Sequence, residues 1–84
     1  MSQPASPRDT IFQLLTQIAP EVESESDFDP SANLREEIDI DSMDFLNLIE
    51  GIAAQLSVEV PEKDYRQLVS FNDIVEYVRS ATSR

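Results

Sequence analysis

Apolar residues recur three and four positions apart in three stretches of this chain, at residues 7–19, 42–56 and 71–78. This spacing is the period of an amphipathic α-helix that turns one face toward a core. In the first stretch the apolar face consists of Ile11, Leu14, Leu15 and Ile18. The pattern predicts an all-α fold in which three helices share one core.

The first and last of these stretches begin behind helix-capping residues. Ser6 is followed by Asp9, and Ser70 is followed at the same distance by Asp73. A hydroxyl residue with an acidic residue at the third helical position is close to the pattern of a capping box. Because Pro20 cannot continue a helix, the first helix is expected to end just before it.

Residues 20–41 join the first two long helices, and they are acidic and rich in Pro, Ser and Asp. No sustained helical period runs through them, which indicates a long loop. So long a loop in a small domain is usually either functional or disordered. Its spaced apolar residues favour a loop anchored to the core, and these anchors are Phe28, Leu34, Ile38 and Ile40. The alternative is a floppy acidic connector.

The segment "EKDYRQL" after Pro61 is long enough for one or two helical turns, whereas "VEVP" before it is too short for a strand of a sheet. The expected fold is therefore a small four-helix bundle of three main helices and one short helix. We expect a single domain over residues 1–84, frayed at 1–5 and 80–84. A chain of 84 residues buries about 60% of its unfolded surface, so a deep enzymatic cleft is not expected.

The net charge of -11 comes from 17 acidic and 6 basic residues. This charge repels nucleic acid and anionic membranes and favours partners with basic surfaces. The first residues carry no signal peptide or transit peptide pattern, and no apolar run approaches membrane-spanning length. We expect a soluble, cytoplasmic monomer, complete from Met1.

Cysteine and histidine are both absent. The chain therefore lacks disulfides, the usual zinc ligands and the imidazole that activates a catalytic serine or cysteine. No metal site and no catalytic activity of its own are expected. A serine with a chemical role in this chain would be the target of another enzyme.

One serine, Ser42, stands where the acidic loop meets the second apolar stretch, in "DIDSMDFLNLI". Asp41 or Ser42 at that place is ordinary capping of a helix. An EF-hand loop starting at Asp39 is a second interpretation. That loop fails because Met43 and Asp44 would occupy a ligand position and the position that needs glycine.

Along nearly its whole length the sequence resembles the acyl carrier protein family. The corresponding parts are a first helix, a long acidic loop, "DSMDFLNLIEGIAAQL" as second helix, "VEVPEKDY" leading into a short third helix, and "SFNDIVEYV" as fourth helix. The family has an Asp-Ser-Leu motif at the start of its second helix. Asp41-Ser42-Met43 matches that motif with Met in place of Leu.

The resemblance implies that Ser42, with Asp41 and Met43 beside it, is the attachment site of a 4'-phosphopantetheine. A phosphopantetheinyl transferase would add this group from coenzyme A, and its thiol would carry acyl groups for enzymes of fatty acid, lipid or polyketide-type biosynthesis. Two physical points agree with this assignment. The chain has no thiol of its own, and the N-terminus of a helix favours a phosphate.

The resemblance also implies two further sets of residues. Partner enzymes with basic patches would dock on Asp41, Met43, Asp44, Asn47, Glu50 and Ala54. The acyl chain would enter a space between the helices lined by Phe28, Leu46, Ile49, Ile52, Ala53 and Ile74.

The second helix departs from the common family pattern at several positions. Asn47, Ala53 and Ala54 stand where carriers of fatty acid synthesis have Glu, and Asp39 replaces a frequent Gly. This predicts a specialised carrier for a dedicated pathway. Two other interpretations stay open, an aminoacyl or peptidyl carrier and an unmodified acidic helical adaptor.

Overall fold

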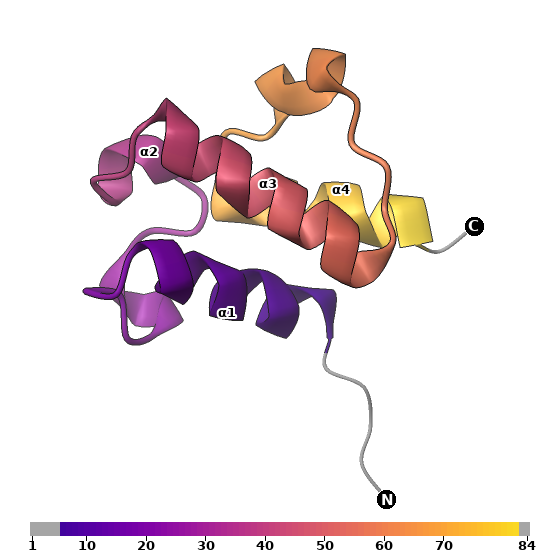
Figure 1. The fold of residues 1–84 in the computed structure, drawn as a ribbon. Helices are drawn as coiled ribbons and strands as arrows, with labels where there is room; N and C mark the ends of the chain where they lie inside the picture. Colours follow the sequence, from indigo (N-terminus) through magenta and orange to yellow (C-terminus); the bar gives the residue numbers. More distant parts are fainter. Residues whose placement is uncertain (1–5, 83–84) are drawn as a thin grey trace, which may run out of the picture.

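Helices of very different lengths alternate with irregular segments along the chain (Figure 1). The computed structural model describes residues 6–82. Its elements are α1 (Pro7–Ile18), η1 (Glu25–Asp27), α2 (Leu34–Glu37), α3 (Ser42–Leu56), η2 (Glu62–Gln67) and α4 (Phe71–Thr82), where η denotes a 3-10 helix. No β-strand forms among the described residues, so the prediction of an all-α fold with three main helices is confirmed.

The helix starts follow the capping residues of the sequence. The Ser6 side chain accepts a hydrogen bond from the Asp9 backbone N–H at 3.3 Å. At α4 the cap is reciprocal, because Ser70 Oγ accepts from the Asp73 N–H at 3.0 Å and Asp73 Oδ2 accepts from the Ser70 N–H at 3.1 Å. These bonds satisfy N–H groups that have no partner inside the helix.

α4 runs further than the sequence predicted. The expectation that the chain frays from residue 80 onward is wrong for residues 80–82, which continue the helix. The other residues expected to fray, 1–5 and 83–84, lie outside the described part of the chain.

α1, α3 and α4 enclose the core. Its fully buried side chains are Ile11, Leu15, Leu34, Leu48, Ile49, Ile52, Phe71, Ile74 and Val78. Gly51 of α3 lies against α1, since a Cβ added there would stand 3.5 Å from Cδ2 of Leu14. This is an ordinary van der Waals distance, so the contact between α1 and α3 does not require a glycine.

Residues 20–41, the first connection, are anchored as the sequence predicted. The expected anchors Phe28, Leu34, Ile38 and Ile40 are all buried, and Val22 joins them. The predicted absence of helix is wrong at two places, because η1 and α2 each form a short turn here. The floppy-connector interpretation is not what the structure shows.

Residues 57–70, the second connection, contain the short helix that the sequence predicted, in 3-10 form. In Figure 1, η2 and α1 lie on opposite sides of α3. Val58 and Leu68 are the buried apolar side chains of this connection. Among the described residues, no helix combines the length and apolar character that crossing a membrane requires.

Candidate functional site

Ser42 is the first residue of α3, and its side chain is exposed. The helix cap is Asp41, whose Oδ1 accepts a hydrogen bond from the Asp44 N–H at 2.9 Å. Of the two capping candidates in the sequence, Asp41 therefore performs this role and Ser42 does not. The Ser42 hydroxyl remains available for chemistry outside the helix.

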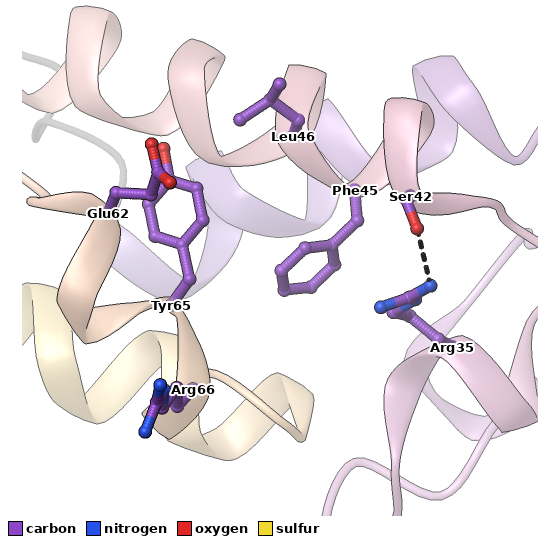
Figure 2. Close-up of a pocket in the computed structure, with 7 residues that line it drawn as sticks. All are labelled: Arg35, Ser42, Phe45, Leu46, Glu62, Tyr65 and Arg66. Carbon is purple, nitrogen blue, oxygen red and sulfur yellow. Dashed lines mark hydrogen bonds between the residues drawn. The ribbon is translucent and has the colours of Figure 1, made fainter.

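The hydroxyl of Ser42 contacts a cation. Nη2 of Arg35 donates a hydrogen bond to Ser42 Oγ over 2.9 Å (Figure 2). The guanidinium carbon of Arg35 also lies 5.8 Å from the centre of the Phe45 ring, within the range of a cation–π interaction. The serine at the start of α3 is thus paired with an arginine of α2.

A pocket of about 500 Å³ opens beside this pair. Its lining residues are Arg35, Ser42, Phe45, Leu46, Glu62, Tyr65 and Arg66. Figure 2 shows η2 on one side and Arg35 of α2 on the other, with the Phe45 ring pointing from α3 into the space between them. The pocket therefore places the Ser42 hydroxyl beside the apolar and aromatic side chains of Phe45, Leu46 and Tyr65.

Sequence reasoning did not single out four of these lining residues, Arg35, Glu62, Tyr65 and Arg66. One signal was present, because Arg35 is the single basic residue in the acidic stretch 20–41. The contact itself joins residues seven positions apart across a turn. Arg35 and Ser42 belong to different helices, α2 and α3, so the period of neither helix predicts the contact and the turn geometry was needed to find it.

The residues proposed for docking lie along α3. Met43 among them is a large apolar side chain that is 65% exposed. Asn47, Glu50 and Ala54 are exposed as well, Asp41 is exposed at the cap, and Asp44 is half-buried. The structure therefore leaves these side chains accessible on one helix next to Ser42.

The residues proposed for an acyl-chain cavity occupy two different environments. Leu46 lines the pocket beside Ser42. Phe28, Ile49, Ile52 and Ile74 are buried in the core, whereas Ala53 is half-buried. In particular, the Phe28 ring packs edge-to-face on Phe71 with 5.4 Å between ring centres.

A hydrogen bond between Tyr77 and Asp64 connects the η2 wall of the pocket to α4. The Tyr77 hydroxyl donates a hydrogen bond of 2.5 Å to Asp64 Oδ2. This bond favours the neutral phenol and, with partial burial and the Asp64 charge, raises the pKa of Tyr77 to about 12. The phenol is therefore protonated at neutral pH and can donate this bond.

The acidic side chains do not assemble a metal site in the part of the chain that the structure describes. No group of three or more carboxylates within residues 6–82 has an arrangement that could hold a metal ion. Asp41, which an EF-hand loop would need as a ligand, caps α3 instead.

Comparison with known proteins adds an independent finding. Residues 10–78 match the family model described as a phosphopantetheine attachment site. The chain is 30% identical over 54 residues to an acyl carrier protein of Rubrobacter xylanophilus, and the match covers 64% of this chain and 67% of that protein.

Two further relatives are similar in the same way. A mitochondrial acyl carrier protein of Neurospora crassa is 26% identical over 76 residues, covering 87% of this chain and 57% of that protein. An acyl carrier protein of Lactobacillus johnsonii is 31% identical over 48 residues, covering 57% of this chain and 60% of that protein. The matches with these last two relatives thus span less than two thirds of their length.

Proposed function

Because the chain belongs to the acyl carrier protein family, whose prosthetic group is a covalently attached 4'-phosphopantetheine, we propose that Ser42 is the residue that carries this group. The observation that supports the proposal most directly is the state of the Ser42 hydroxyl. It is exposed at the first position of α3, it does not cap the helix, and it faces a cation. It also lies within the matched residues 10–78.

The surroundings of Ser42 suit a phosphodiester. Such a group carries one negative charge and several strong acceptor oxygens. The first turn of α3 offers backbone N–H groups and the positive end of the helix dipole, and Arg35 adds a full positive charge. Asp41 opposes the anion, but its Oδ1 is already engaged with the Asp44 N–H.

The attachment reaction is a transfer from coenzyme A. Ser42 Oγ attacks the phosphorus nearest the pantetheine, the phosphoanhydride bond breaks, and adenosine 3',5'-bisphosphate leaves. The hydroxyl proton must pass to a base. The chain has no histidine, so we propose that a phosphopantetheinyl transferase supplies this base and the geometry of the transfer.

The carrier role follows from the chemistry of the arm. The chain has no cysteine, and the thiol of the attached group is what holds an acyl chain as a thioester. We propose that the protein presents such acyl intermediates to enzymes of fatty acid, lipid or polyketide-type biosynthesis and catalyses no step itself. The apolar wall of the pocket, formed by Phe45, Leu46 and Tyr65, offers a surface beside the arm for part of this cargo.

Partner enzymes are proposed to dock on the exposed side of α3. Asp41, Asp44 and Glu50 would meet basic patches around the entrances of those enzymes, and the exposed Met43 would add an apolar contact. Such charge pairs act mainly on the rate of association and weaken with salt.

The neutral positions Asn47 and Ala54 on the exposed side of α3 support the proposal of a specialised carrier. The specialised role can be tested with the general enzymes of fatty acid synthesis. The measurement compares how fast they elongate acyl chains on this protein and on a housekeeping carrier. We expect poor elongation on this chain, and equal elongation would overturn the specialised role.

We also propose that the chain is one carrier domain that works in the cytoplasm. The family match over residues 10–78 supports a single domain, since it includes every long helix in whole or in large part. The relatives include a protein named as mitochondrial, so the compartment needs its own test. Cell fractionation with an antibody against the chain provides it.

The main experiment is intact mass spectrometry before and after incubation with coenzyme A and a broad-specificity phosphopantetheinyl transferase. We expect wild type to gain one phosphopantetheine and Ser42→Ala to gain none. Ser57→Ala, at the other end of α3, is the matched control and should be modified like wild type. A folded wild type that gains no mass would overturn the proposal in favour of an unmodified adaptor.

A further inference from the structure

We propose that Arg35 is a positioning residue for the prosthetic group, binding the phosphodiester on Ser42 and directing the base of the arm toward the pocket. This inference rests on the proposed function, because it requires a phosphodiester at Ser42. What carries it is the contact already formed in the structure, in which Arg35 Nη2 lies 2.9 Å from Ser42 Oγ.

The backbone of Arg35 is firmly placed. Its N–H donates to Oδ1 of Asn33, the cap of α2, over 3.0 Å. The preceding residue, Leu34, has no exposed surface, and its N–H donates to the carbonyl oxygen of Val69 at 2.9 Å. The arginine thus projects from a short helix that is held by its cap Asn33, by the burial of Leu34 and by a backbone hydrogen bond to Val69.

The guanidinium of Arg35 is oriented by a second contact and is not neutralised. It lies over the ring of Phe45, itself a buried residue of α3. Within residues 6–82 no carboxylate stands within ion-pair distance of this group, although Glu36 and Glu37 follow it directly in the sequence. An arginine that makes no ion pair in a chain of charge -11 is available for an anionic ligand.

Phosphate is the anion that matches this geometry. A guanidinium presents several N–H donors in one plane and binds phosphate oxygens with paired, charge-assisted hydrogen bonds. Once Ser42 Oγ becomes an ester oxygen it is a poorer acceptor, and the charge lies on the non-bridging oxygens of the adjoining phosphorus. Arg35 therefore needs to shift its hydrogen bond only from Oγ to those neighbouring oxygens.

The expected consequence concerns the direction of the arm. Arg35 and Phe45 line the pocket between α3 and η2, together with Tyr65. A phosphodiester held by Arg35 therefore lies at the edge of this pocket, and the arm starts toward its aromatic interior.

The test begins with wild-type protein before and after modification, with the mass gain verified in the same sample. NMR of the arginine side chains should show the Arg35 guanidinium signals shifting on modification, with exchange against water slowed at least about two-fold. Arg8 is the internal control, because its guanidinium is engaged by Glu25 and Asn72 and should not respond.

Variants then test whether Arg35 contacts the phosphate group on Ser42. In the modified protein, Arg35→Gln should shift the phosphorus NMR signal, whereas Arg66→Gln should leave it in place. The second variant removes the same charge from the same pocket, but Arg66 makes no hydrogen bond to Ser42. Circular dichroism confirms that each variant is folded.

The outcomes separate the two proposals. A wild type that gains no phosphopantetheine overturns the proposed function and this inference with it. A modified wild type whose Arg35 signals match those of the unmodified protein overturns this inference alone. Equal phosphorus shifts for Arg35→Gln and Arg66→Gln would also overturn it, since only the general charge of the pocket would then matter.

Discussion

The two connections of this protein form opposite walls of one pocket and are held in different ways. The first connection, residues 20–41, carries five buried apolar anchors: Val22, Phe28, Leu34, Ile38 and Ile40. The second connection, residues 57–70, has two, Val58 and Leu68. Arg35 belongs to the firmly anchored wall, whereas Tyr65 belongs to the sparsely anchored one.

Backbone hydrogen bonds add to the difference in anchoring between the two connections. The Leu34 N–H donates to the Val69 carbonyl, and the Asn72 N–H donates to the Pro30 carbonyl, each at 2.9 Å. The first connection is thereby fastened to the residues just before and within α4. The η2 segment is connected to α4 by the side-chain bond between Tyr77 and Asp64. We therefore expect the pocket to adapt to its contents by movement of η2, while the Arg35 side stays in place.

The largest expected effect comes from truncating one anchor in each connection. Leu→Ala at a buried site costs about 2–5 kcal/mol, depending on how far the surroundings collapse. Leu34→Ala should lie near the upper end, because its fixed surroundings cannot close the cavity, and Leu68→Ala near the lower end. Urea denaturation of both variants measures the two free energies of unfolding. Equal losses, or a larger loss at Leu68, would contradict the difference in anchoring.

A smaller effect is expected from Tyr77→Phe, which removes the hydrogen bond to Asp64 and keeps the ring. The free energy of unfolding should fall by about 1 kcal/mol. Hydrogen exchange should accelerate in η2 and remain unchanged in α2. Tyr65→Phe is the control, because the Tyr65 hydroxyl makes no hydrogen bond within the described residues. Faster exchange in α2 as well would show that the two connections are not independent.

Alkaline pH should weaken the same contact without a mutation. The pKa of Tyr77 is raised from 10.0 to about 12 in the folded protein, so the neutral phenol is stabilised by folding. This contribution is complete below pH 10 and is lost as the pH rises from 10 to about 12. The stability difference between wild type and Tyr77→Phe, followed by denaturation across that range, should shrink toward zero. A constant difference would show that the hydroxyl does not titrate as the bond requires.

The difference between buried anchors and contacts of exposed side chains explains what could be predicted from the sequence. The anchors of the first connection were found from apolar residues spaced through an acidic stretch, because burial of Phe28 or Leu34 is decided by side-chain chemistry. Its short helices were missed, since a single turn leaves no period to detect. Ser42 was identified through the motif around it. Its partner Arg35 was not, because their contact depends on how the turn between α2 and α3 places two exposed side chains.

The smallest expected effect lies in the acid range and concerns the first connection alone. Oδ2 of Asp27 accepts hydrogen bonds from the Glu23 and Ser24 N–H groups at 2.8 and 3.1 Å, and these bonds lower the pKa of Asp27 below 3.8. The ionised carboxylate is thus the form that folding stabilises. Its contribution is present above pH 3.8 and disappears as the pH falls through the lowered pKa.

Because Asp27 is exposed, water competes for these bonds, and the loss should be small beside that of an anchor such as Leu34. The measurement is the stability difference between wild type and Asp27→Asn as a function of pH, together with the amide signals of Glu23 and Ser24. Both should titrate below pH 3.8, while the amides of η2 stay unaffected. Titration of these amides at or above pH 3.8 would mean that the bonds are not maintained in solution, and that the first connection is held by its buried anchors alone.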